Sequence, residues 1–153
     1  LISIQAMDRE GRIRTIPISE IKYDYRNSNL DKNHIYLSAS FKGIRKDKEK
    51  IQEEMEYLKK KKETSQPSRI KTGGSTFKNP INQTSEKVWS LIKKSVSVKK
   101  TFGDAAISEK HSNFLINKGN ATSKDMKKLI EYIKSQVKVK TGISLETEIE
   151  LIE

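Results

Sequence analysis

The chain has 153 residues, a formal net charge of +11 and no cysteine. This length accommodates one domain, or one domain with a remnant of another. The lack of cysteine excludes a disulfide framework, a thiolate zinc site and a cysteine nucleophile. No stretch approaches the roughly 20 apolar residues of a membrane-spanning helix, and no signal peptide opens the chain. We therefore expect a soluble, cytoplasmic protein with no membrane partner.

The positive charge is spread along the chain and mixed with glutamate, and only Lys59 to Lys62 forms a block. Such a block suits the carboxyl end of a helix, where it offsets the negative end of the macrodipole. The alternative is a non-catalytic basic module that binds nucleic acid or another polyanion. The chain has no nucleic-acid motif and few aromatic residues for base stacking, so we expect no nucleic-acid partner.

The first forty residues predict strands. Apolar and polar residues alternate over 1–6 and 12–18, with a turn at 8–11 between them, which is typical of a hairpin. A third extended run covers 34–41. The residues expected on one side of this run are Ile35, Leu37, Ala39 and Phe41. These three strands lack the rest of a sheet on which they could pack.

Three later segments have the period of an α-helix. The first covers 47–63, with its apolar residues on one face, and Gln66-Pro67 then marks a boundary between two pieces. The second covers 85–95. The third starts at a capping box formed by Thr122 and Asp125 and runs to about Val139.

Two further strands complete the second piece, a short one over 113–117 and a last one over 144–152. Within the last strand, Glu146, Glu148 and Glu150 fall on one face because side chains alternate. If solvent covers this face, the row of glutamates is only a hydrophilic surface. In a cleft, burial and like-charged neighbours would favour a protonated carboxyl that could donate a proton. The predicted core comprises Val88, Trp89, Ile92, Phe114, Ile116, Leu129, Ile130, Ile133, Leu145 and Ile149.

The segment Gly73–Pro80 has the composition of a binding site. Its two glycines permit positive φ and let a ligand approach the backbone. The hydroxyl of Ser75 can give up a proton, and Lys78 and Asn79 can meet anionic oxygens. An ordinary surface loop that ends at a proline is the alternative.

Arg26 is the third candidate for a functional site, after the row of glutamates and the segment Gly73–Pro80. It lies between Tyr25 and Asn27, where most arginines are exposed and have no structural task. A guanidinium nevertheless suits a carboxylate ligand, because it binds bidentately and stays charged at any relevant pH.

Taken together, four segments resemble the UDP-N-acetylenolpyruvoylglucosamine reductase family and occur in the family's order. They are residues 23–28, 73–80, 103–117 and 142–149. The resemblance covers the whole chain but only the C-terminal half of the family's protein, because the glycine-rich flavin-binding segments have no counterpart. It implies an α+β fold. Its parts would be a remnant of the FAD-binding domain sheet (1–44), a connecting helix and linker (45–65) and a C-terminal substrate-binding α+β domain (66–153).

The resemblance also implies a reaction and its residues. NADPH would reduce FAD, and hydride would then pass to the enolpyruvyl ether of a UDP-sugar to give UDP-N-acetylmuramate, a peptidoglycan precursor. Arg26 and Glu148 would stabilise the developing negative charge, and Ser75 would deliver the proton. Glu146 competes with Glu148 for the acidic role. The residues implied in substrate binding are Asn79, Lys78, Lys71 and Tyr25, and no metal is expected.

One branch of the family carries an extra loop with a substrate-clamping tyrosine. No such segment lies between Gly43 and Ser75, so the chain resembles the branch without that loop. We expect that the chain alone retains no FAD. The resemblance then implies a separate flavin-binding chain as partner, or a split or degraded gene as the source.

Overall fold

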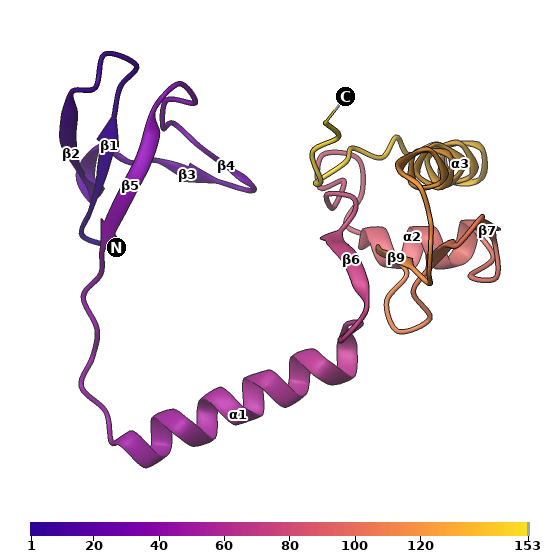
Figure 1. Cartoon of the computed structure of the whole chain (residues 1–153), viewed down its shortest axis with the longest axis horizontal. Coiled ribbons are helices and arrows are strands. Elements are labelled where there is room, and N and C mark those ends of the chain that lie inside the picture. Colours follow the sequence, from indigo (N-terminus) through magenta and orange to yellow (C-terminus); the bar gives the residue numbers. More distant parts are fainter. Residues whose placement is uncertain (153) are drawn as a thin grey trace. The chain divides into compact units, whose positions relative to one another are not determined.

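The computed structural model of the chain describes residues 1–152 (Figure 1). Within that range, α-helices are combined with antiparallel sheets, which confirms the predicted α+β class. The chain divides into two compact units, Leu1 to Ile51 and Gln52 onward, so the division falls inside helix α1 (Lys48–Ser65). Each unit has its own hydrophobic core.

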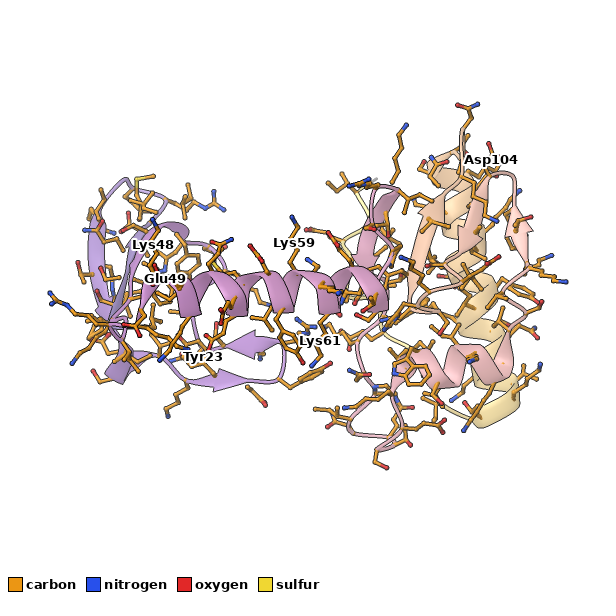
Figure 2. All side chains as sticks on the ribbon, turned by 90° about the horizontal axis from the view of Figure 1, so that it is seen from below. Tyr23, Lys48, Glu49, Lys59, Lys61 and Asp104 are labelled. Carbon is orange, nitrogen blue, oxygen red and sulfur yellow. The ribbon has the colours of Figure 1, made fainter. Side chains whose placement is uncertain are left out.

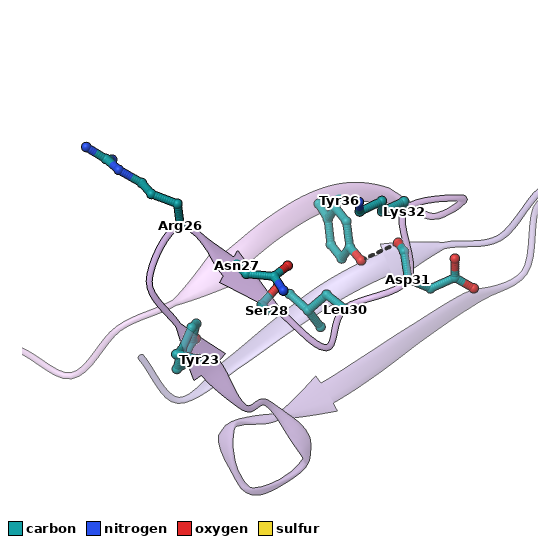
Figure 3. A pocket seen from close by; sticks show the side chains of 8 residues that line it. All are labelled: Tyr23, Arg26, Asn27, Ser28, Leu30, Asp31, Lys32 and Tyr36. Atoms are coloured by element: carbon teal, nitrogen blue, oxygen red, sulfur yellow. Dashed lines mark hydrogen bonds between the residues drawn. The ribbon is translucent and has the colours of Figure 1, made fainter. Parts of the chain in front are cut away.

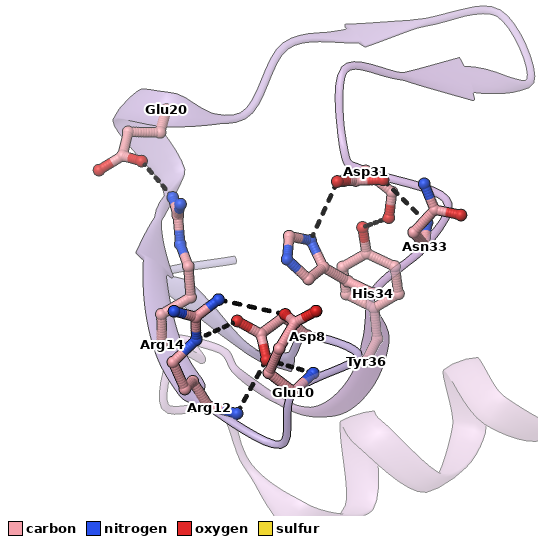
Figure 4. Close-up of polar contacts among 9 residues, drawn as sticks. All are labelled: Asp8, Glu10, Arg12, Arg14, Glu20, Asp31, Asn33, His34 and Tyr36. Atoms are coloured by element: carbon pink, nitrogen blue, oxygen red, sulfur yellow. Dashed lines mark hydrogen bonds and ion pairs between the residues drawn. The ribbon is translucent and has the colours of Figure 1, made fainter.

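The first unit contains a three-stranded antiparallel sheet. Its strands are β1 (Ser3–Met7), β2 (Ile13–Pro17) and β5 (Ile35–Ser40), in the order β2-β1-β5. The predicted hairpin of β1 and β2 is confirmed. Its turn is held by Asp8, whose carboxylate accepts bonds from the N–H of Glu10 at 3.0 Å, the N–H of Arg12 at 2.9 Å and Arg12 Nε at 2.8 Å (Figure 4).

A β-bulge interrupts the pairing of β1 with β5. Met7 pairs with Ile35 and Ile4 pairs with Ala39, so β5 has one more residue than β1 over this stretch. Because one extra residue reverses the alternation of side chains, Ile35 and Ala39 lie on opposite faces of the sheet. The prediction that the apolar residues of this run share one side is therefore wrong.

The two faces of this sheet are covered differently. On one face Ala6 and Ile16 are buried together with Ile21, which follows a 3-10 turn (Ile18–Glu20). On the other face Ile13, Met7 and Ile35 stand directly opposite one another across the three strands. Ile13 and Ile35 are 59% and 47% exposed. This apolar row is a surface that a further layer of protein could cover.

Helix α1 buries none of its residues, all of which are described. The predicted helix is confirmed, but its apolar side chains at Ile51, Met55 and Leu58 are exposed. Figure 2 shows Lys59 and Lys61 extending to opposite sides of the ribbon. The lysine block therefore forms a solvated helix end rather than a one-sided basic face.

The second unit contains a four-stranded antiparallel sheet in the order β6-β9-β8-β7. The strands are β6 (Lys71–Ser75), β7 (Thr101–Phe102), β8 (Ala105–Ile107) and β9 (Phe114–Asn117). Helices α2 (Val88–Ser95) and α3 (Ser123–Thr141) contribute to one core with Ala105, Ile107 and Leu115. Because opposite residues share a face, Ala106 and Ile116 belong to the other side of the sheet.

Two sequence predictions for this unit are wrong. Trp89 was expected in the core, but it is 45% exposed. Helix α2 buries a stripe of residues that includes Val88, Leu91 and Ile92. Trp89 follows Val88 in the sequence and lies outside this buried stripe. The last strand over 144–152 was also expected, whereas only an isolated bridge joins Thr147 to Phe77. A single bridge cannot hold a longer strand in register.

The N-terminus of α3 is closed by the predicted capping box. The Thr122 hydroxyl oxygen accepts the Asp125 N–H at 3.2 Å, and the Asp125 carboxylate accepts the Thr122 N–H at 3.0 Å. The hydrogen bond from the Thr122 hydroxyl also lowers the pKa of Asp125. Two N–H groups that a helix leaves unpaired at its start are thus satisfied by side chains.

Replacing Thr122 with alanine should lower the free energy of unfolding by about 1 kcal/mol, because the hydroxyl bonds to the Asp125 N–H and carboxylate are lost. Urea unfolding followed by circular dichroism measures this change. Thr122→Ser should restore most of the stability. Ser135→Ala, an exposed change within the same helix, should leave it nearly unaltered. Equal loss in the two alanine variants would contradict this role of the cap.

His111 lies against two aromatic rings. Its ring centroid is 5.0 Å from that of Phe114 and 6.4 Å from that of Trp89. Burial lowers the pKa of His111 because desolvation disfavours the imidazolium. The fold thus prefers the neutral imidazole, whose Nδ1 accepts the Asn113 N–H at 3.3 Å.

Stability should therefore depend on pH through His111. With the pKa lowered in the fold, the unfolded chain binds more protons just below the ordinary value of about 6.5. The contribution of His111 to the unfolding free energy should be complete above a pH of about 6.5. It should decrease as the pH falls from there toward the pKa of His111 in the folded chain. Urea titrations between about pH 7.5 and 5.5 stay above the range of ordinary carboxylates. The unfolding free energy of the chain should decrease as the pH is lowered over this range, and that of His111→Gln should decrease less. An identical pH dependence in the two proteins would refute the assignment to His111.

Candidate functional site

The two glycines of the candidate segment form a bulge inside β6 rather than a loop. Thr72 pairs with Ile116 and Ser75 pairs with Phe114, so β6 holds one extra residue between these pairs. Gly74 adopts φ +86°, a conformation that residues with a side chain rarely take. The bulge keeps Ser75 on the face of Ile116, away from the face that α2 and α3 cover, whereas regular pairing would place it on the helix face.

Beyond Ser75 the chain continues as a strip, Thr76 to Lys78, that meets the C-terminal segment. The Glu148 N–H donates to the Thr76 carbonyl at 2.8 Å, and the Lys78 N–H donates to the Glu146 carbonyl at 2.9 Å. Phe77, only 1% exposed, anchors the strip in the core. Ser75 and Glu148 are thereby brought to adjacent positions of one short antiparallel pairing, although they are 73 residues apart in the sequence.

The opposite edge of the strip is held by Asn113. Its side-chain Oδ1 accepts the Phe77 N–H at 3.0 Å, and its Nδ2 donates to the Phe77 carbonyl at 2.9 Å. Sequence reasoning assigned Asn113 only to a strand. A polar residue directly before the apolar run 114–116 is the one signal that could have drawn attention to it.

The two acidic candidates have different surroundings. Glu146 is exposed, and its carboxylate accepts a bond from Lys78 Nζ at 2.5 Å. Glu148 is half-buried and lies next to the buried Thr76. Lys78 is thus paired with the competitor carboxylate, whereas Glu148 lies opposite Thr76, the residue after Ser75.

Asn79 and Lys71 occupy different surroundings again. The Asn79 Oδ1 accepts the N–H of Val88, the first residue of α2, at 3.0 Å. Its amide oxygen therefore supports the helix. Lys71 is the first residue of β6, is exposed and stands opposite Asn117, at the other end of the strand from Ser75.

Arg26 and Tyr25 belong to the first unit, at the tip of a hairpin formed by β3 (Tyr23–Asp24) and β4 (Asn27–Ser28). Arg26 has φ 56°, which is uncommon for a residue other than glycine, asparagine or aspartate. Its guanidinium carbon lies 5.8 Å from the centre of the Tyr25 ring. Arg26 is the second residue of the two-residue turn between these strands, where a positive φ is common, and Arg69 has a similar φ of 57°.

A cavity of about 470 Å³ lies beside this hairpin (Figure 3). Tyr23, Leu30 and Tyr36 contribute to its lining, and the Tyr36 hydroxyl donates to the Asp31 carbonyl at 2.6 Å. Figure 3 shows the Arg26 side chain extending away from the other labelled residues. The hairpin tip therefore presents its guanidinium outward from the unit.

At each helix start of the second unit a side chain accepts an N–H group, and such groups can otherwise bind an anion. At α2 the Val88 N–H is taken by Asn79, and at α3 the Thr122 N–H is taken by the Asp125 carboxylate. Among residues 1–152 no three His, Cys, Asp or Glu residues gather as a metal site. Over the same range no helix has the length and apolar character needed to cross a bilayer.

The chain was compared with known proteins. The family model for the UDP-N-acetylenolpyruvoylglucosamine reductase C-terminal domain matches residues 66–152. The protein of that name from Pelagibacter ubique is 55% identical over 152 residues, which are 99% of this chain and 50% of the relative. The one from Novosphingobium aromaticivorans is 44% identical with the same coverage.

A crystal structure described as UDP-N-acetylenolpyruvylglucosamine reductase from Thermus caldophilus has a TM-score of 0.78 and 29% identity. The match covers 98% of this chain and 52% of that one. The chain thus spans about half the length of the relatives that it matches. With most of its second unit matched by the family model, the chain belongs to the UDP-N-acetylenolpyruvoylglucosamine reductase family.

Proposed function

We propose that the chain supplies the substrate-binding half of a reductase that converts the enolpyruvyl ether of a UDP-sugar to UDP-N-acetylmuramate. The family and the names of its relatives support this reaction. The observation that carries the proposal is the main-chain pairing of the strip Thr76 to Lys78 with residues 146–148, which brings Ser75 and Glu148 into one part of the second unit.

In the proposed reaction a hydride adds to the terminal carbon of the enolpyruvyl double bond. The electron pair of that bond moves toward the adjacent carbon and its carboxylate. Ser75 then gives its hydroxyl proton to the adjacent carbon, so that the carbon–carbon double bond has become a single bond. The serine oxygen regains a proton from solvent. A hydroxyl is a weak acid, so its contribution depends on a fixed position; a positioned donor is worth about 10²- to 10⁴-fold.

The negative charge that develops before this proton transfer needs a partner. A guanidinium binds a carboxylate through two parallel bonds and keeps its charge, which is the role proposed for Arg26. The tight turn between β3 and β4 presents this side chain at the hairpin tip. Tyr25, whose ring lies beside the guanidinium, would restrict the arginine.

Glu148 is the proposed acidic residue, and Glu146 is assigned a different task. Glu146 already neutralises Lys78, with its carboxylate 73% exposed. Exposed ion pairs contribute only about 0–1 kcal/mol, so a substrate diphosphate could take the place of Glu146 on Lys78. Asn79 would contribute its amide N–H groups, because its oxygen supports α2. Lys71 would add positive charge near the substrate.

The hydride would come from FAD regenerated by NADPH. Because the chain spans about half the length of its relatives, we propose that a separate flavin-binding half would hold the cofactor. The exposed row of Ile13, Met7 and Ile35 is the part of the first unit suited to contact that half.

On its own, the 153-residue chain should neither retain FAD nor oxidise NADPH. Purified chain should be colourless after incubation with FAD and desalting, by absorbance in the flavin bands. It should bind UDP-N-acetylglucosamine weakly in a calorimetric titration. A parallel titration with DNA at two salt concentrations tests the polyanion alternative, which requires affinity that falls steeply with salt. Yellow, NADPH-oxidising protein would overturn the expectation for the cofactor.

Activity is tested in a fusion that joins this chain to the part of the Pelagibacter ubique relative that has no counterpart in it. The fusion should oxidise NADPH beyond one equivalent per flavin only when the enolpyruvyl substrate is present. Ser75→Ala should slow substrate reduction by about 10²-fold or more, because the proton donor is lost. The matched control Ser97→Ala, at an exposed serine of the same unit, should change the rate less than about twofold. Full activity in the Ser75 variant would exclude this hydroxyl as the proton donor.

A further inference from the structure

Asn113 makes a bidentate contact with the backbone inside the second unit. Its Oδ1 accepts the Phe77 N–H at 3.0 Å and its Nδ2 donates to the Phe77 carbonyl at 2.9 Å. The Asn113 main-chain carbonyl also accepts the Thr76 N–H at 2.8 Å. The residue is only 4% exposed, so water does not compete for these bonds.

The contact between Asn113 and Phe77 lies directly beyond the end of the regular pairing of β6 with β9. The pairing of β6 with β9 ends at Ser75 and Phe114, just after the bulge. Beyond that point the Asn113 amide satisfies the polar groups of Phe77 that a strand neighbour would otherwise pair. A side-chain amide is suited to this, since it carries an acceptor and a donor next to each other.

The strip Thr76 to Lys78 is consequently held from both edges. Asn113 holds one edge, and Glu146 and Glu148 hold the other through their main chains. Ser75 is covalently attached to this strip, and the Glu148 N–H is bonded to its Thr76 carbonyl. Any shift of the strip would therefore move the hydroxyl and the carboxylate together.

We propose that Asn113 is the positioning residue that fixes the strip, and with it the attached Ser75, in the place required for proton delivery. The inference rests on the proposed function. The inference assigns a role in that function to Asn113, which is buried and is not expected to contact the substrate. Its loss would leave the Phe77 N–H and carbonyl unpaired in a dry site, a condition that strongly favours local rearrangement.

The test uses Asn113→Asp with Asn117→Asp as its matched control. Asn117 also holds main chain through its amide, accepting the N–H groups of Gly119 and Ala121 at 2.9 and 3.0 Å, but in a different loop. An ionised carboxylate can accept the Phe77 N–H but cannot donate to the Phe77 carbonyl. A protonated carboxyl can do both, and burial raises the pKa of a carboxyl placed there.

The first measurement follows amide hydrogen exchange in the 153-residue chain near pH 8. In Asn113→Asp, exchange at Phe77 and Glu148 should accelerate by about tenfold or more relative to Asn117→Asp, because one hydrogen bond of the strip is lost. This readout requires no turnover. Unchanged exchange at both amides would overturn the proposal even if the fusion is an active reductase.

The second measurement follows single-turnover substrate reduction by the fusion, with substrate saturating. At about pH 8 the Asn113→Asp variant should be about 10- to 100-fold slower, since small displacements of reacting groups have effects of that size. Its KM should change little. As pH falls and the introduced carboxyl becomes protonated, the deficit relative to the unmodified fusion should shrink. Because His111 accepts the Asn113 N–H, the same comparison is repeated with His111→Gln in both proteins, and the recovery at low pH should persist.

A purely structural role predicts a different pattern. Asn113→Asp and Asn117→Asp would then lose thermal stability and rate in the same proportion, with no recovery of the rate ratio at low pH, and this result would overturn the proposal. Should the unmodified fusion fail to reduce substrate, the proposed function is at fault. The exchange measurement would still decide whether Asn113 sets the position of the strip.

Discussion

The second unit depends on one three-residue strip, Thr76 to Lys78, that is hydrogen-bonded along both edges. The Asn113 amide satisfies one edge, and the main chain of Glu146 and Glu148 satisfies the other. Phe77 fixes the strip from below by inserting its ring into the core. Because backbone groups in a dry interior must be paired, these bonds leave the strip little freedom to shift. The same contacts that complete the fold therefore determine where a hydroxyl and a carboxylate are presented.

The bulge at Gly73 and Gly74 adds the second constraint. An unbroken strand would place Ser75 on the face covered by helices, where a hydroxyl would be buried among apolar side chains. One extra residue returns it to the other face, and a glycine with φ +86° accommodates that residue. A Cβ at Gly74 would meet no atom within 4 Å, so backbone conformation rather than space explains the glycine.

Features encoded by neighbouring residues were predicted correctly from the sequence. The hairpin of β1 and β2 follows from alternation and a turn, and the start of α3 follows from Thr122 and Asp125. Features that depend on distant contacts were not. The exposure of Trp89 depends on how α2 is rotated against its core, and the bulge in β5 opposite Gln5 and Ala6 changes a side-chain alternation that looks regular in the sequence. Ser75 was identified from composition and resemblance, whereas Asn113 has no local pattern that separates it from an ordinary strand residue.

The contrast between the two acidic residues follows from their distance to the anchored part of the strip. Glu146 lies opposite Lys78, where the pairing reaches solvent, and its carboxylate meets an ammonium with most of its surface exposed. Glu148 lies opposite Thr76, which is buried and bonded on its other side to Asn113. An exposed ion pair can exchange its partner at little cost, whereas a carboxylate attached to fixed main chain keeps its position. The strip therefore carries an exchangeable charge at its exposed end and a half-buried carboxylate at its anchored end, although the two residues are only two positions apart in the chain.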